Sequence, residues 1–273
     1  MAEMSVIWLR VAAALYSLGL LHAILTLVRK RDQLFRVALI AFTVGTVLHF
    51  VSIVEQGLIA GHCPITNFYE NLSMCGFLIA VLFLFVYWRY RLGTLSAFIF
   101  PLVFMMSLVA TLGNPVSAWS SPAVRNVWLT VHIVLVLLGY AALVFTAVAA
   151  LLYLVQEREL KRKKPRQFYY RLPPLATLDD LISKSMAVGF VFITLAIIAG
   201  STWAFVELKT RWLSDPKIVI SFFTWGIYLA MVFFRVTAGW RGRKAAVMAV
   251  VALGCSVVTW AAHAHLGSVL LKP

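Results

Sequence analysis

One short connection carries most of the residues in this chain that could bind a ligand. The segment WAFVELKTRWLSDPK, residues 203–217, lies between two long apolar runs. It holds two tryptophans, the cations Lys209, Arg211 and Lys217, and the acid Asp215. An ordinary connection is built from Gly, Ser and Asn. Flat aromatic surface beside fixed positive charge suits a flat, apolar ligand that also carries negative charge.

The histidines are the obvious ligands for a metal or cofactor. At about 1.5 Å per residue, His132 lies roughly two turns into the apolar run 126–156. His263 and His265 lie in the last turns of the run 245–268, at a similar depth. Two imidazoles at one level can hold a six-coordinate haem iron, while tryptophans pack on the porphyrin and cations pair with its propionates. The alternative is that His132 bonds a neighbouring helix and that His263 and His265 lie at the membrane interface.

The other histidines have simpler interpretations. His49 is near the middle of an apolar run, and no other run offers a histidine at its depth, which favours a hydrogen bond to Ser or Thr over a second, deeper haem site. His62 lies in the connection AGHCPITNFYEN, and His22 lies towards the far end of the first run. Five polar or aromatic residues around that connection are expected to fix it by hydrogen bonds, with recognition of a substrate polypeptide as the alternative: Glu55, Asn67, Tyr69, Glu70 and Asn71.

Composition fixes the elements that must position these residues. The chain has 273 residues, is 62% hydrophobic and 12% charged, and has a mean hydropathy of +0.92, which excludes a soluble globular domain. Its net charge of +14 gathers between apolar runs, as in a membrane protein and unlike a nucleic-acid binder. Cys63, Cys75 and Cys255 show no metal-type spacing.

The apolar runs predict an all-α integral membrane protein, a bundle of about eight transmembrane helices. The expected spans are 5–28, 36–60, 69–89, 95–113, 126–156, 184–206, 217–235 and 245–268. The fifth should extend into water at QERELKRKK. In RLPPLATLDDLI, residues 171–182, two prolines precede Thr177, which predicts a separate short interfacial helix. With no repeat or change in composition, residues 1–273 read as a single domain, and no cleavable signal peptide is evident.

The basic connections orient the bundle. Cations follow the first, third, fifth and seventh spans, so the positive-inside rule puts both termini outside. The connection 203–217 breaks this pattern, because it lies outside and yet carries Lys209, Arg211 and Lys217. Cations kept on that side indicate an anionic ligand there.

Several motifs together resemble one family, the CcsA/ResC group of haem-handling proteins of cytochrome c biogenesis, which is related to CcmC and CcmF. The connection 203–217 and the helix after it resemble the family's tryptophan-rich WWD signature. GHCPITNFYENL, TVHIVLVLLGYAALVFTAVAALLYLVQERELKRKK, LPPLATLDDLISKSMAVGF and GWRGRKAA are similar to further family motifs in the same order. The residues in register with the signature are Trp203, Ala204, Trp212, Asp215, Pro216, Lys217, Thr224, Trp225, Tyr228 and Arg235.

The resemblance implies a protein of the bacterial plasma (inner) membrane that presents haem b, iron protoporphyrin IX, on the outer face. There the thiols of an apocytochrome c CxxCH segment form thioether bonds, and a CcsB/ResB-like membrane partner completes a holocytochrome c synthase. It implies His132 as one axial ligand, with His263 or His265 as the second. The implied haem cradle comprises Trp203, Lys209, Arg211, Trp212, Asp215, Lys217 and Trp225.

The sequence departs from the family pattern at several places. The family usually has Trp, Gly, Trp and Glu where this chain has Leu208, Lys209, Ser214 and Ile218, and it has a transmembrane His where this chain has Phe233. The C-terminal histidines are shifted, and no CcsB-like portion is fused. These departures leave two alternatives, a HemX-type protein that binds haem or regulates its supply without attaching it, and a membrane assembly factor without a cofactor.

Overall fold

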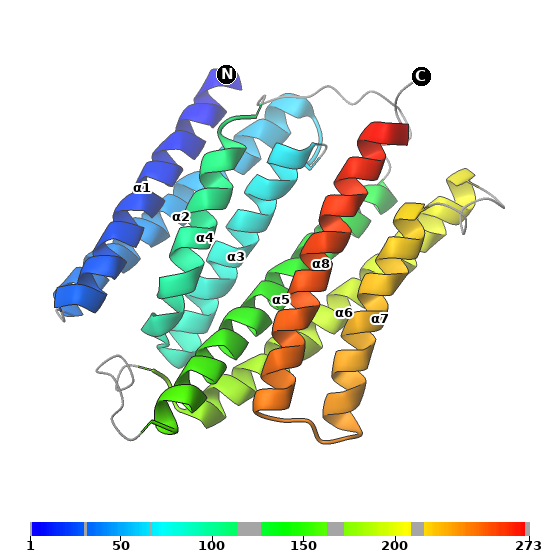
Figure 1. Ribbon diagram of the computed structural model, residues 1–273. Helices are drawn as coiled ribbons and strands as arrows, with labels where there is room; N and C mark the ends of the chain where they lie inside the picture. Colours follow the sequence, from blue (N-terminus) through cyan, green and yellow to red (C-terminus); the bar gives the residue numbers. More distant parts are fainter. Residues whose placement is uncertain are drawn as a thin grey trace. The chain divides into compact units, whose positions relative to one another are not determined.

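The structure, a computed structural model, describes residues 2–29, 32–65, 67–113, 127–162, 172–208 and 216–270. Over these ranges the chain is helical, and the only other regular element is the short 3₁₀ turn η1 (Gly93–Leu95). The helices are α1 (Ala2–Arg29), α2 (Asp32–Ala60), α3 (Phe68–Tyr90), α4 (Ser96–Ala110), α5 (Val127–Leu160), α6 (Leu175–Leu208), α7 (Pro216–Val236) and α8 (Arg243–Leu270). Figure 1 shows them along the chain.

Seven helices, α1 to α7, are long and apolar enough to cross a membrane within the part of the chain that is described. The prediction of an all-α, multi-pass membrane protein is therefore confirmed. The eighth predicted span corresponds to α8, a helix of 28 residues. Many large apolar side chains face outwards, for example Ile40 at 63% exposure, as expected for helices surrounded by lipid.

The helices form two compact units, residues 1–126 and 127–273. In the first unit α1 packs on α2 and α4, and α3 packs on α2 and α4. Its core is aromatic: the ring of Phe42 stacks on that of Phe100 with centroids 4.0 Å apart, and Phe83 meets both rings edge-on. Burying large rings that interdigitate holds these helices together by dispersion, because lipid offers no hydrophobic driving force between helices.

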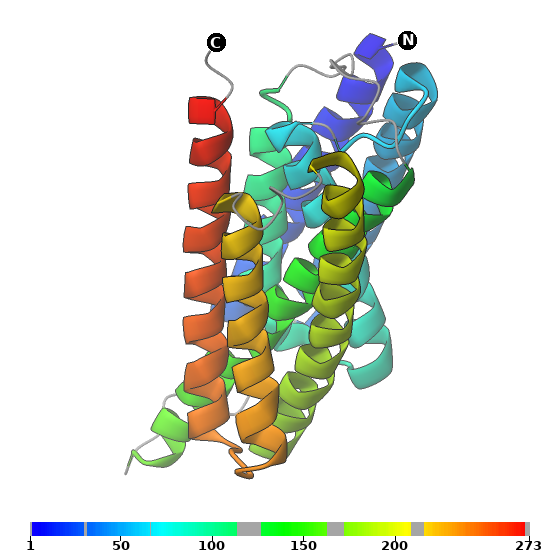
Figure 2. The same ribbon diagram turned by 90° about the vertical axis from the view of Figure 1, so that its right-hand side faces the viewer.

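The second unit is a four-helix arrangement in which α5 packs on α6 and α8, and α7 packs on α6 and α8. Figure 2 shows α7 and α8 running side by side. Tyr228 of α7 is fully buried and donates a hydrogen bond to the carbonyl oxygen of Gly139 in α5, at 3.0 Å. A Cβ atom at Gly189 of α6 would lie 2.6 Å from the Tyr228 hydroxyl, so the glycine makes room for this bond.

The prediction of a separate interfacial helix starting at Thr177 is wrong. The single helix α6 begins at Leu175, directly after the prolines, and runs unbroken to Leu208. The carbonyl oxygen of Pro174 accepts from the amides of Thr177 and Leu178, so the first turn is already helical. Leu178 and Ile182 are fully buried, which fixes this segment within the bundle.

Candidate functional site

His132 lies near the start of α5 and packs against α6. Its Nδ1 atom is 2.7 Å from the carbonyl oxygen of Ala196. A carbonyl oxygen can only accept, so Nδ1 carries the proton and donates. The lone pair of the neutral ring is then on Nε2. A hydrogen bond from one ring nitrogen to a backbone carbonyl is the arrangement that orients metal-binding histidines.

Gly200 lets the imidazole ring of His132 lie against the backbone of α6. A Cβ atom at this position would be 2.6 Å from both Cε1 and Nδ1 of His132, closer than real carbon contacts allow. Residues four apart share a helix face, so Ala196 and Gly200 lie on the side of α6 that the ring contacts. Gly200 lies within the apolar run 184–206. The pattern of that run alone does not predict which side chain contacts the glycine.

Trp203 belongs to the same face of α6. It follows Ala196 by seven residues, two turns of helix and about 10 Å along the axis. Its indole Nε1 is buried and has no hydrogen-bond partner among the described residues. A buried N–H group normally has a partner, so this one can still donate to an acceptor. His132 and Trp203 therefore lie along one face of α6, at its C-terminal half.

Trp225 of α7 contacts a different side of α6. Its Nε1 donates to Thr194 Oγ1 at 3.1 Å, and its ring stacks on Phe190 with centroids 6.4 Å apart. Thr194 and Ala196 are two residues apart and so point about 200° apart around the helix. The indole N–H of Trp225 thus already forms a hydrogen bond between α7 and α6, whereas that of Trp203 has no partner among the described residues.

The side chains of the other predicted site residues are not among those that the structure describes. Lys209, Arg211, Trp212 and Asp215 are in the segment 209–215, which the structure does not describe. Three others are in described helices, but their side chains are not described: Lys217 on α7, and His263 and His265 on α8. Their assignment as cradle residues and second axial ligand stays a prediction.

His49 has the structural role that the sequence favours. It is fully buried in the first unit, its Nε2 is 2.9 Å from Ser73 Oγ on α3, and its Nδ1 is 3.3 Å from the Tyr16 hydroxyl on α1. The predicted bond to Ser or Thr of an adjacent helix is confirmed. Both ring nitrogens have a polar neighbour, so His49 joins three helices.

Of the five residues predicted to fix the connection between α2 and α3, Asn67 forms a hydrogen bond at the start of α3. Asn67 caps α3, with its side-chain oxygen accepting from the amide of Glu70 at 2.9 Å. Glu70, Gln56 and Ser73 line a small pocket at this end of the first unit, with about 310 Å³ of empty space including its open mouth. Glu55 Oε2 and Asn71 Oδ1 are buried without a hydrogen-bond partner among the described residues.

Comparison with known proteins identifies the family. The family model for cytochrome C assembly protein matches residues 7–262, across both units. A cytochrome c biogenesis protein CcsA of Prochlorococcus marinus (strain MIT 9301) is 29% identical over 247 residues, covering 81% of this chain and 78% of the relative. CcsA of Guillardia theta is 29% identical over 222 residues, covering 74% and 72% of the two chains. That of Heterosigma akashiwo (strain NIES-293 / 8280G21-1) is 27% identical over 218 residues, covering 67% and 68%. The chain belongs to the cytochrome c assembly protein family, as a multi-pass membrane protein related to CcsA.

Proposed function

We propose that this protein binds haem b and presents it on the outer face of a bacterial plasma membrane for attachment to the CxxCH segment of an apocytochrome c. The observation that carries the proposal is the orientation of His132, whose Nδ1 donates to Ala196 while its Nε2 lone pair can bind iron. Membership of the cytochrome c assembly family supports the same role.

The described residues fit a haem in two further respects. Trp203 offers indole surface on the face of α6 that His132 contacts, and its buried Nε1–H has no hydrogen-bond partner within the described parts of the chain. A porphyrin has a flat apolar ring for the indole and two propionates whose oxygens accept hydrogen bonds. An apolar ligand without acceptors would leave this N–H unsatisfied, at a cost of about 1–3 kcal/mol.

Each residue has a distinct role in this proposal. His132 would be one ligand of the haem iron, and His263 or His265 would be the second. Trp203 and Trp212 contribute aromatic surface, whereas Trp225 packs on another side of α6, against Thr194 and Phe190. Lys209, Arg211 and Lys217 pair with propionates, and Asp215 belongs to the same cradle. The haem supplies vinyl groups to which cysteine thiols can add, and the protein orients it and sets its axial ligation.

An absorption spectrum tests the haem site. The full chain is purified with haem available, oxidised and reduced, beside His132→Ala and the double variant His263→Ala/His265→Ala. We expect a low-spin Soret band in the wild type, its loss or shift in both variants, and recovery of the His132→Ala spectrum with imidazole. His22→Ala is the matched control, because the only hydrogen-bond neighbour of its ring among the described residues is the carbonyl oxygen of Leu18 in the same helix. An unchanged spectrum in His132→Ala would remove His132 from the site.

A partner distinguishes attachment of haem from simple binding. As a subunit of a holocytochrome c synthase, the protein requires a separate CcsB/ResB-like membrane protein, which should copurify with it. Phe233, which is 55% exposed on α7, stands where the family has a transmembrane His and favours a second candidate, a HemX-type protein without attachment activity. Haem binding without a copurifying partner, and without thioether formation on added apocytochrome, would support that candidate.

A further inference from the structure

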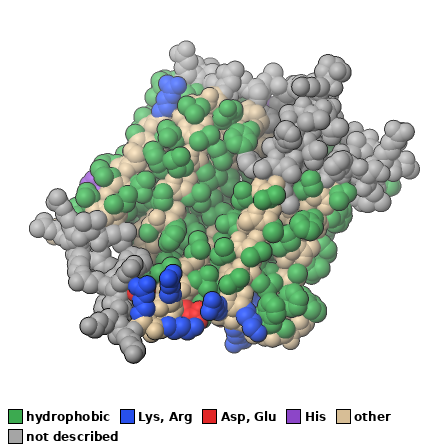
Figure 3. All heavy atoms as spheres, viewed as in Figure 1, with side chains coloured by type: hydrophobic (Ala, Val, Ile, Leu, Met, Phe, Trp, Pro, Cys, Tyr) green, Lys and Arg blue, Asp and Glu red, His purple; other side chains and the backbone are tan. Residues whose placement is uncertain are grey.

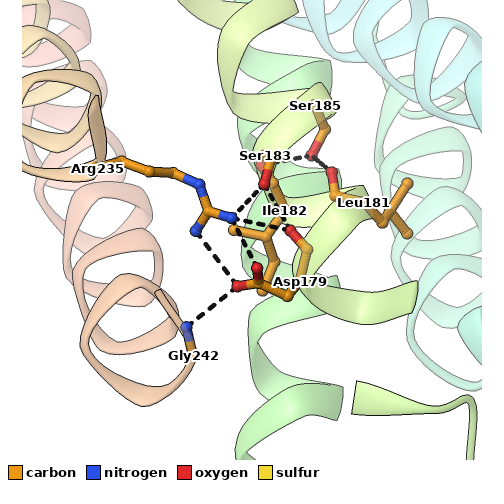
Figure 4. Close-up of polar contacts among 7 residues, drawn as sticks. All are labelled: Asp179, Leu181, Ile182, Ser183, Ser185, Arg235 and Gly242. Carbon is orange, nitrogen blue, oxygen red and sulfur yellow. Dashed lines mark hydrogen bonds and ion pairs between the residues drawn. The ribbon is translucent and has the colours of Figure 1, made fainter. Parts of the chain in front are cut away.

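The turn between α7 and α8 is held in place by one carboxylate. Asp179 of α6 accepts from Arg235 of α7, with Nη2 2.9 Å and Nη1 3.3 Å from its oxygens, and from the amide of Gly242 at 3.1 Å. Arg235 also donates to Ser183 Oγ and to the carbonyl oxygen of Asp179. Figure 4 shows these bonds joining the end of α7, the turn and α6. Only 10% of the Arg235 side chain is exposed, so this cation serves the fold.

Residues 240–244, WRGRK, which we name the basic turn, follow this anchor. Trp240 stacks on Phe234 with centroids 4.6 Å apart and an interplanar angle of 15°, and Lys244 Nζ lies 5.5 Å from the Trp240 centroid. Gly239 and Gly242 have φ of +63°, which other residues rarely adopt, so the path of the turn depends on them. The turn is therefore an anchored element that exposes Arg241, Arg243 and Lys244.

The described acids at this end of the second unit are already paired. Glu157 bonds Lys161, Glu159 bonds Arg162, Asp179 bonds Arg235, and Asp180 bonds Lys184. No described carboxylate forms an ion pair with Arg241, Arg243 or Lys244, although Arg241 interacts electrostatically with Asp179 at longer range. Figure 3 shows Lys and Arg side chains along the lower edge of this face, below a broad hydrophobic surface.

The positions of these cations are unfavourable without an anion. Arg243 and Lys244 are the first residues of α8, where the helix dipole is positive, and the first turn contains no acid. Cations at this end of a helix lower its stability, and a bound anion removes that penalty.

The apolar surface above the basic turn indicates which anion fits. Val247 and Val251 follow Arg243 at intervals of four residues, on one side of α8, and are 45% and 56% exposed. Val236 at the end of α7 is 76% exposed. A free phosphate would use the cations alone, whereas a phospholipid would place its headgroup on the cations and its acyl chains along these valines. Trp240 is also a residue typical of the membrane interface.

We propose that the basic turn binds the headgroup of an anionic phospholipid, with Arg241, Arg243 and Lys244 contacting the phosphate and the valines of α7 and α8 contacting the acyl chains. This site is independent of the proposed haem site. It binds a lipid from the leaflet at the end of α7, which the positive-inside rule assigns to the cytoplasmic side.

Thermal unfolding in detergent tests the site. The full chain is titrated with dioleoyl phosphatidylglycerol, dioleoyl phosphatidylcholine or inorganic phosphate, and the unfolding midpoint is followed by circular dichroism. A ligand that binds only the folded state raises the midpoint, so we expect phosphatidylglycerol to raise it and the other two to have little effect. Each cation near an anionic surface strengthens binding by about fivefold, so Arg241→Gln/Arg243→Gln should need roughly 25-fold more phosphatidylglycerol for the same shift.

Arg89→Gln/Arg91→Gln is the matched control. It removes two exposed arginines from the end of α3, where each also lies over a tyrosine ring, and it should titrate like the wild type. An unchanged titration of the Arg241/Arg243 variant would overturn the proposal. An equal loss of phosphatidylglycerol binding in the control variant would also overturn the proposal, because it would show general attraction between the lipid and any exposed cation. A shift with inorganic phosphate equal to that with phosphatidylglycerol would replace it with a site for free phosphate. No shift with phosphatidylglycerol would leave an acidic protein partner as the ligand of these cations and would refute lipid binding.

Discussion

Replacing Gly200 with alanine should destabilise the protein only while His132 is present. The added Cβ would lie 2.6 Å from two ring atoms of His132, whereas ordinary contact begins at 3.4 Å, so the ring would have to move by about 0.8 Å. Such a shift lengthens the 2.7 Å bond to Ala196 to the limit of a hydrogen bond. Losing that bond costs about 0.5–1.5 kcal/mol and overpacking about 1–3 kcal/mol. The better helix propensity of alanine returns about 0.5–1 kcal/mol. We expect a net loss of about 0.5–4 kcal/mol.

A double-mutant cycle isolates the cause of this loss. In a His132→Ala background, Gly200→Ala should instead stabilise the protein by about 0.5–1 kcal/mol, because only the helix propensity remains. Gly226→Ala in α7, where a Cβ would meet nothing within 4 Å, is the control and should be neutral or stabilising with His132 intact. The free energy of unfolding is measured by titration with sodium dodecyl sulfate, followed by tryptophan fluorescence. Equal effects of Gly200→Ala in both backgrounds would refute the contact between His132 and α6.

Three further changes test other parts of the fold. Asp179→Asn should lower the free energy of unfolding by about 1–3 kcal/mol, because it leaves the guanidinium of Arg235 mostly buried without its counter-ion; an unchanged titration with dodecyl sulfate would contradict this. His49→Ala should cost about 2–5 kcal/mol, since it opens a cavity and removes the partner of the Ser73 hydroxyl, while the Tyr16 hydroxyl keeps its bond to Thr46. An effect no larger than that of an exposed substitution would exclude this buried site as a source of stability. Burial and then the negative charge of Glu70 raise the pKa of the Cys63 thiol, so its maleimide labelling should be slow at neutral pH and accelerate as the pH rises above that range. Glu70→Gln should move this rise to lower pH, and an unmoved profile would show that Glu70 does not act on the thiol.

The lengths of the apolar runs predict that the helices exist. They do not predict the residue at which α6 begins. Two prolines before Thr177 indicate a break, and a break is compatible with either a separate interfacial helix or a direct start of the long one. The buried side chains of Leu178 and Ile182 decide for the long helix. Their burial depends on packing between helices that are distant in the sequence, which local signals do not contain.

The two interpretations of His132 are compatible in the structure. The sequence offers a ligand of haem iron or a hydrogen bond to a neighbouring helix as alternatives. The bond exists, and because it uses Nδ1 it leaves Nε2 for a metal. Which nitrogen bonds, and that Ala196 and Gly200 are its neighbours, depends on the register between α5 and α6. No pattern within either segment specifies that register.

Polar bonds from α6 set this register and connect the two ends of the second unit. Asp179 bonds Arg235 near one end, and Ala196 bonds His132 in the C-terminal half. Between them, Thr194 accepts from Trp225. In a membrane such bonds hold neighbouring helices in one alignment, because a slipped register leaves polar groups without partners in an apolar medium. A slip of α6 by one residue would rotate its face by about 100° and break all three bonds at once. The same helix, α6, thus positions the anchor of the basic turn and the face that carries Trp203 and contacts His132. Asp179 and Trp203 lie about 36 Å apart along its axis.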